Sequence, residues 1–355
     1  MTAVSPLPND RCPYDALTPD LVVDALASVG LQADGRLTSL NSYENRVYLA
    51  HLEHAIDPED RAPDAVVLKF YRPGRWSRAQ ILEEHAFAAE LMAADVPMVG
   101  PLCLSGLAGQ PSTLHAFNGF DFSVSPRRGG RRPELDDVEV LEWTGRLLAR
   151  LHTVGAAQPF VHRPALTLQT FAIEPAEWLL AHQIIPMDVQ SEWQRAFKIA
   201  IDLVANCEMD AARTRENSHP IRLHGDCHPG NILWTPADQP GGGPHFVDLD
   251  DARTGPAVQD LWMLLSGDRR DQTQQLSALL DGYEQLRDFD RQELALIEPL
   301  RTLRLIHYSA WLARRWEDPI FPLNFPWFGS SDYWRGQVNM LVEQAEAMQA
   351  PPLCV

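Results

Sequence analysis

The residues of this chain best suited to chemistry lie in the segment 222–251, where polar side chains recur at a defined spacing. The segment contains the pattern H-x-D-x-x-x-x-N, formed by His224, Asp226 and Asn231. Loops that transfer phosphoryl groups have this spacing, with the aspartate as the base and the asparagine as a metal ligand. A carboxylate must accept the proton of the attacking hydroxyl while an amide oxygen holds magnesium on the phosphates. The segment therefore predicts phosphoryl transfer.

Asp248 completes the predicted site. It follows a short apolar run with β-branched and aromatic residues, His245-Phe246-Val247, and it offers a hard oxygen to the same magnesium ion. Pro240 and the Gly-Gly-Gly-Pro run at 241–244 predict a turn before this run, so the loop and the strand are expected to return side by side as a hairpin. We count Asp248 among the catalytic residues and, with Asn231, as a metal ligand.

Two other interpretations of this segment are weaker. His224, Cys227 and His228 are possible zinc ligands, but the sequence has no second cysteine or histidine cluster at zinc spacing. An acidic turn after a strand is usually only solvated. That interpretation does not require an aspartate, an asparagine and a second aspartate in this order, which favours phosphoryl transfer.

The same residues carry a resemblance to a known family. With 247–250 and 255–262, the loop resembles the phosphotransferase superfamily of aminoglycoside and choline kinases. More narrowly, nearly the whole chain resembles the bacterial stress response kinase A family, YihE-like serine/threonine protein kinases. Further similar segments are 40–48, 69–73 and the tryptophan-rich end, and the visible departures are insertions near 54–64 and at 236–244. The resemblance implies ATP as co-substrate, protein serine or threonine as acceptor, a role in stress protection, and an Asp260 that braces the catalytic loop.

A lysine and a glutamate are expected to serve the phosphates. Lys69 lies in the β-rich run 64–71, where a buried lysine needs an anionic partner; the alternative is a lysine on an edge strand that reaches solvent. In the phosphotransfer interpretation it binds the α- and β-phosphates and pairs with a glutamate of the following helix, predicted at 77–94. Glu84 shares a face with the apolar Leu91 and is our choice, and the adjacent Glu83 is the fallback.

The predicted phosphate turn has a weaker signal. The chain has no G-x-G-x-x-G, but 41–45 can form a turn that presents N–H groups and the Ser42 hydroxyl to a phosphate, as the resemblance also implies. An ordinary polar hairpin turn has the same appearance. Downstream, 126–133 breaks the periodicity and suits a hinge. Helices are predicted at 136–152, 188–206, 257–266, 272–284 and 291–315.

Composition sets the outer bounds. With 355 residues, 45% hydrophobic residues and 10 tryptophans, the chain can fill two cores. A formal charge of −18 argues against nucleic acid and anionic membranes as partners. The five cysteines show no pair spacing, and neither a signal-peptide core nor a membrane-length apolar run is present. We expect a cytoplasmic protein, acting as a monomer.

These observations predict an α+β fold of the two-lobed, protein-kinase-like class. A β-rich nucleotide-binding lobe is expected at 1–125, a hinge at 126–133 and a mainly helical lobe for catalysis and acceptor binding at 134–355. Two alternatives stay open: a kinase of small molecules such as aminoglycosides or choline, and an inactive kinase-like binding module. The aromatic segment 318–329 either lines the acceptor side or packs over the last helix.

Overall fold

The structure is a computed structural model that describes residues 13–56, 64–106, 109–214, 219–236, 238–239 and 242–355. It divides into two compact units, neither of them continuous in sequence. Unit 1 comprises Met1–Ala89, Val99–Gly129 and Trp316–Asn324. Unit 2 comprises Glu90–Met98, Gly130–Arg315 and Phe325–Val355. Each unit has its own secondary structure and is described by itself.

Unit 1 is built on an antiparallel five-stranded sheet with strand order β1-β2-β3-β7-β6. Helix α1 (Pro19–Ser28) precedes the sheet, and Thr18 caps it by accepting a hydrogen bond from the N–H of Leu21. The strands are β1 (Ala33–Ser39), β2 (Arg46–Leu52), β3 (Ala65–Phe70), β6 (His115–Phe117) and β7 (Phe120–Pro126), with a small separate pair of β4 (Leu104–Ser105) and β5 (Pro111–Ser112).

The alternation of side chains along β3 determines which residues are buried against α1. Leu68 and Phe70 are fully buried in one apolar cluster with Leu26 of α1 and Phe122 of β7. Because successive strand residues point to opposite faces, Lys69 lies on the other face of the sheet. Helix α2 (Arg78–Ala93) supplies the glutamate that this lysine meets. The sequence pattern thus predicted both the strand and the helix.

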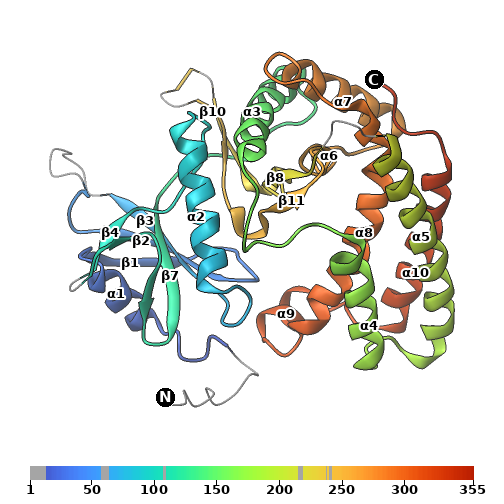
Figure 1. The fold of residues 1–355 in the computed structure, drawn as a ribbon. Helices are drawn as coiled ribbons and strands as arrows, with labels where there is room; N and C mark the ends of the chain where they lie inside the picture. Colours follow the sequence, from blue (N-terminus) through green and yellow to red (C-terminus); the bar gives the residue numbers. More distant parts are fainter. Residues whose placement is uncertain (1–12, 57–63, 107–108, 215–218, 237, 240–241) are drawn as a thin grey trace. The chain divides into compact units, whose positions relative to one another are not determined.

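Unit 2 is mainly helical, with two short hairpin-like strand pairs that hold the loop 224–231. In the pairs, β8 (Ile221–Leu223) runs antiparallel to β11 (Arg253–Gly255), and β9 (Ile232–Thr235) runs antiparallel to β10 (Gly243–Phe246). The long helices α5 and α10 pack side by side, as do α3 and α7 (Figure 1). The helices are α3 (Val138–Ala157), α4 (Glu174–Ala181), α5 (Met187–Thr214), α6 (Val258–Trp262), α7 (Arg269–Tyr283), α8 (Ile297–Arg314) and α10 (Ser331–Gln349).

The predicted helices and the predicted hairpin are confirmed, with shifted ends. The prediction at 257–266 proves to be the short α6, and that at 291–315 divides into a 3-10 turn at Arg291–Leu296 and α8. Among the described residues, four further α-helices were not predicted: α1, α4, α9 (Ile320–Asn324) and α10. The insertions near 54–64 and at 236–244 fall between paired strands, although 57–63, 237 and 240–241, like the N-terminal residues 1–12, lie outside the described part of the chain.

The two units are not separated at a single hinge, although the sequence predicted one. The chain passes between units after Gly129, within the expected 126–133, but 90–98 and 316–324 also change unit. The first of these segments joins unit 2 because Glu90 pairs with Arg222 at 2.6 Å and Pro97 accepts a 2.8 Å hydrogen bond from the N–H of Phe246. Among the described residues, no helix is both long enough and apolar enough to span a membrane.

Candidate active site

The candidate active site of unit 2 begins where the chain leaves β8. Gly225 has a φ of +84°, which glycine adopts at little cost, and a Cβ there would lie 2.2 Å from the carbonyl oxygen of Asp251. The backbone therefore turns sharply between His224 and Asp226. The imidazole of His224 is buried and donates from Nε2 to the carbonyl of Val247 at 2.9 Å. The loop and the segment before Asp248 are joined at this point.

Asp260 braces the start of the loop. Its carboxylate, fully buried at the start of α6, accepts hydrogen bonds from the N–H groups of His224 and Gly225, both at 2.8 Å. His152 approaches the same carboxylate at 3.2 Å and contacts the hydroxyl of Tyr283 at 3.0 Å. Charge-assisted bonds to two consecutive amides fix the loop where it begins. This is the bracing role that the resemblance implied.

Asn231 connects Asp226 to the residue before Asp248. Its Nδ2 donates to the carbonyl of Asp226 at 3.0 Å, and its own carbonyl accepts a hydrogen bond from the N–H of Val247 at 3.0 Å. The residue after Val247 is Asp248, at a φ of +63°. The structure therefore brings Asp226, Asn231 and Asp248 together. The strand itself ends at Phe246, so Asp248 follows the strand and does not terminate it.

Asp226 also meets a cation. Oδ1 of Asp226 lies 2.8 Å from a guanidinium nitrogen of Arg304 on α8, while Nε2 of His228 lies 3.5 Å from Oδ2. Oδ1 is buried and accepts no hydrogen bond of good geometry, so its interaction with Arg304 is one of charge and distance. With Oδ1 beside the cation, Oδ2 is the carboxylate oxygen left to accept a hydrogen bond from an incoming hydroxyl.

The two residues after Asp226 are not zinc ligands in this structure. Cys227 is fully buried, and burial raises the pKa of its thiol well above the ordinary value, which disfavours the thiolate that zinc requires. Nδ1 of His228 accepts a hydrogen bond from the N–H of Gly230 at 2.9 Å, and burial lowers the pKa of this imidazole. In the described part of the chain, no group of three histidine, cysteine or acidic residues is placed to hold a metal ion.

Unit 1 holds the predicted phosphate lysine. Nζ of Lys69 lies 3.7 Å from Oε1 of Glu84, the glutamate selected by the helix-face argument, and both side chains are largely buried. The ammonium also lies 5.2 Å from the centre of the Tyr71 ring. A buried lysine is stabilised by such neighbours, one anionic and one with a negative π face. The role of this pair toward a nucleotide stays a prediction.

Ser42 lies in the turn between β1 and β2, where the sequence predicted a turn. Its side chain is half-buried. Arg72, in the loop that follows β3, donates to the carbonyl of Glu44 at 3.0 Å and contacts the Glu44 carboxylate at 3.0 Å. The turn is therefore tied to the end of the strand that carries Lys69.

Comparison with known proteins decides the family. Residues 36–297 match the model of the family described as the phosphotransferase enzyme family, APH. The chain belongs to this family. The predicted fold class, a two-lobed α+β kinase-like fold, is thereby confirmed, and so is the resemblance to the aminoglycoside and choline kinase superfamily.

The relatives of this phosphotransferase are similar over nearly their whole length. It is 46% identical over 345 residues to stress response kinase A of Escherichia coli K12, which covers 97% of this chain and 98% of the relative. It is 44% identical over 340 residues to the serine/threonine protein kinase RdoA of Salmonella typhimurium, covering 96% of each. A solved structure of amicoumacin kinase hAmiN, with AMP-PNP, Ca²⁺ and Ami, matches with a TM-score of 0.66 at 20% identity and 96% coverage of each chain.

Arg304 was not identified from the sequence of this phosphotransferase. It lies within a predicted helix, and no motif distinguishes it from the other arginines of the chain. The aromatic segment divides in two. Residues up to Asn324 belong to unit 1, whereas in unit 2 Phe325 contacts Trp311 and Phe328 packs against Tyr333 and Trp334 of α10. The sequence left two alternatives for this segment, and residues 325–329 follow one of them: they pack over the last helix.

Proposed function

We propose that this phosphotransferase transfers the γ-phosphoryl group of ATP to the hydroxyl of a serine or threonine in a protein. The observation that carries the proposal is the position of Asn231, which holds Asp226 through its side chain and Val247, the neighbour of Asp248, through its main chain. The proposed base and both proposed metal ligands thus lie on one loop and the turn beside it. Transfer to a hydroxyl depends on this positioning.

Asp226 is the proposed base. It accepts the proton of the acceptor hydroxyl while that oxygen forms a bond to the γ-phosphorus, the bond from phosphorus to the β–γ bridging oxygen breaks, and ADP leaves. Arg304 holds Oδ1 of this carboxylate at 2.8 Å and thereby limits its rotation. His228 and Asp260 act on the loop and not on the acceptor.

The donor atoms of the site suit magnesium. Because Nδ2 of Asn231 is occupied by the carbonyl of Asp226, Oδ1 is the amide atom left for a cation, and Asp248 adds a carboxylate. Hard oxygen donors are the ligands that magnesium prefers. Asn231 and Asp248 would hold magnesium, which would supply positive charge to the phosphates of ATP.

Unit 1 contributes the remaining proposed nucleotide contacts. Lys69, oriented by Glu84, binds the α- and β-phosphates, and the turn with Ser42 binds phosphate through N–H groups and the hydroxyl. An inactive binding module is the weaker proposal, because Lys69, Asp226, Asn231 and Asp248 are all present.

A protein acceptor is supported by the printed name of a relative, serine/threonine protein kinase RdoA, at 44% identity. The names of other relatives, including stress response kinase A, support a role in stress protection. We also propose that the reaction takes place in the cytoplasm and that the enzyme is a monomer. A small-molecule acceptor is the second candidate, because a solved structure of similar fold is an aminopropanol kinase, with a TM-score of 0.66 at 16% identity.

The test measures phosphate transfer from γ-labelled ATP in the presence of magnesium. In one arm the enzyme is given the proteins of a cell lysate as acceptors, and in the other a panel of amino sugars, choline and amino alcohols. Asp226→Asn is the matched control; it keeps the shape of the side chain, and kcat is expected to fall on the order of 10²- to 10⁴-fold with the ATP affinity nearly unchanged. Label on protein serine or threonine supports the proposal. Label only on small molecules selects the second candidate, and no label in either arm overturns both.

A further inference from the structure

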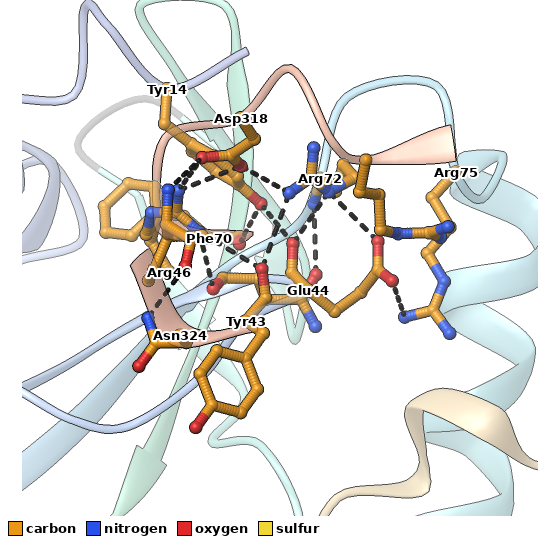
Figure 2. A network of polar contacts seen from close by, with 12 residues as sticks. Tyr14, Tyr43, Glu44, Arg46, Phe70, Arg72, Arg75, Asp318 and Asn324 are labelled. Atoms are coloured by element: carbon orange, nitrogen blue, oxygen red, sulfur yellow. Dashed lines mark hydrogen bonds and ion pairs between the residues drawn. The ribbon is translucent and has the colours of Figure 1, made fainter. Parts of the chain in front are cut away.

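A carboxylate from late in the chain lies among the arginines that hold the turn at 41–45 (Figure 2). Asp318 belongs to Trp316–Asn324, the last segment of unit 1, and its side chain is 5% exposed. Its two oxygens accept hydrogen bonds from Nη2 of Arg46 at 2.9 and 3.0 Å, and Oδ2 accepts a further one from Arg72 at 2.6 Å. Two guanidinium groups therefore share one carboxylate.

The same two arginines also hold the backbone of the turn. Arg72 donates to the carbonyl of Glu44 at 3.0 Å and to that of Tyr43 at 3.4 Å, and Arg46 donates to the carbonyl of Tyr43 at 3.3 Å. The hydroxyl of Tyr14 reaches the Glu44 carbonyl at 3.2 Å. Each arginine thus connects Asp318 to a carbonyl oxygen of the turn (Figure 2).

The direction of these carbonyls determines what the other side of the turn presents. The peptide bonds of the described residues are trans, so each carbonyl points opposite to the N–H of the next residue. With the carbonyls of Tyr43 and Glu44 turned toward the arginines, the N–H groups of Glu44 and Asn45 point away from them. Consecutive N–H groups on one side of a turn form a site for an anion such as phosphate.

The burial of the arginines makes this arrangement dependent on Asp318. The side chains of Arg46 and Arg72 are 16% and 11% exposed, and both guanidinium groups lie over the ring of Tyr14, at 4.3 and 5.4 Å from its centre. Buried cations require a hydrogen-bonded counter-charge, and removal of one partner leaves the other uncompensated. Without the Asp318 carboxylate, Arg46 loses the counter-charge of both its hydrogen bonds, whereas Arg72 keeps the Glu44 carboxylate at 3.0 Å. Arg46 is then expected to turn toward water, and Arg72 to shift toward Glu44, so that the carbonyls of the turn are released.

We propose that Asp318 is a positioning residue for the phosphate turn 41–45, acting through Arg46 and Arg72 without contact to the nucleotide. The inference rests on the proposed function, in which this turn binds phosphate. In this proposal, the segment 316–324 orients the N–H groups of the turn toward ATP.

The test compares Asp318→Asn with the unchanged chain by calorimetric ATP binding, steady-state phosphotransfer and amide hydrogen exchange. The ATP dissociation constant and the KM for ATP are expected to rise together by about tenfold, as for the loss of a charged hydrogen bond, with kcat at saturating ATP nearly unchanged. Exchange at 41–45 is expected to accelerate. In an Arg72→Gln background the same substitution should have a smaller effect, because the two residues act through one connection.

Asp121→Asn is the matched control, because Asp121 pairs with Arg78 at an exposed site of the same unit. It removes the same charge and should leave ATP affinity and exchange at 41–45 unchanged. If Asp318→Asn lowers only thermal stability, with unchanged ATP affinity below the unfolding range, Asp318 has a structural role alone and the inference is overturned. A wild-type chain that binds no ATP overturns the proposed function instead, and exchange at 41–45 then decides whether Asp318 anchors the turn.

Discussion

Arg304 lies with its guanidinium 2.8 Å from Oδ1 of Asp226, so a cation from α8 adjoins the residue proposed as base. The contact fixes one oxygen of the carboxylate. It also leaves Oδ2 toward His228, at 3.5 Å. Such a contact limits which oxygen meets an acceptor hydroxyl.

Replacing Arg304 by glutamine should therefore reduce kcat without weakening ATP binding, because the arginine contacts the base. We expect a loss of roughly 10- to 100-fold, the scale on which a misplaced catalytic group acts. Steady-state phosphotransfer beside calorimetric ATP binding measures both quantities. Arg301→Gln, on the same helix and paired with Glu298 at 3.0 Å, is the control and should retain nearly full kcat. Equal losses in the two variants would show that Arg304 supports only the helix.

Asp248→Ala should abolish transfer and weaken the ATP binding that depends on magnesium. The reason is that Asp248 is one of the two proposed protein ligands, and the loss of a ligand removes much of the affinity for the ion. Calorimetric ATP titrations with and without magnesium measure the effect, and far-UV circular dichroism checks the fold. Asp238→Ala removes an exposed carboxylate from the turn between β9 and β10 and should change neither. Wild-type activity in Asp248→Ala would remove this residue from the site.

Lys69→Ala should weaken ATP binding and transfer together, by roughly 10²-fold in kcat/KM, as for the loss of one group that stabilises charge. Glu84→Gln should cause a smaller loss of both, because the 3.7 Å pair orients the lysine and does not touch the phosphates in the proposal. Glu83→Gln is the neighbouring control and should have little effect. If Glu83→Gln caused the larger loss and Glu84→Gln the smaller one, the choice of Glu84 as the partner of Lys69 would be wrong.

The thiol of Cys227 should resist alkylation in the folded protein. It is fully buried, and its raised pKa keeps it protonated at neutral pH, whereas the thiolate is the reactive form. A variant with serine at positions 12, 103, 207 and 354 leaves this thiol alone. Iodoacetamide labelling followed by mass spectrometry should find it unmodified until denaturant is added, while the exposed Cys103 and Cys354 of the unchanged chain react. Labelling in the folded variant at the rate of a free thiol would contradict the burial.

The parts of the site that the sequence predicted are those held by local structure. The spacing from His224 to Asn231 sets one loop, and the period of β3 sets the face of Lys69, because both depend on neighbouring residues. Arg304 and Asp318 escaped prediction because their partners lie far away in sequence: Asp226 for the former, Arg46 and Arg72 for the latter. An arginine in a helix or an aspartate before a proline has no local signature of such a contact.

In the fold, too, some elements were predicted from local sequence and others were not. Periodicity predicted α2, α3, α5, α7 and α8, but α1 and α10, each capped by a hydroxyl residue, were not recognised although each has an apolar face. A single hinge was expected because the composition changes at 126–133. Contacts between residues instead assign 90–98 to unit 2 and 316–324 to unit 1. The aromatic composition of 318–329 drew attention to the second segment but does not indicate which unit it joins.

The dependence of Arg46 and Arg72 on Asp318 bears on biosynthesis and on fragment design. During translation, the segments 1–89 and 99–129 of unit 1 emerge from the ribosome well before Asp318, the carboxylate that two of their buried cations share, so unit 1 cannot reach its final arrangement until the chain has been made past Asn324. A fragment that ends at residue 133 carries both arginines, and Glu44 beside Arg72, but lacks the Asp318 carboxylate that the two arginines share. We expect it to be poorly folded when expressed alone, and a separate peptide spanning 316–324 is the reagent to restore it.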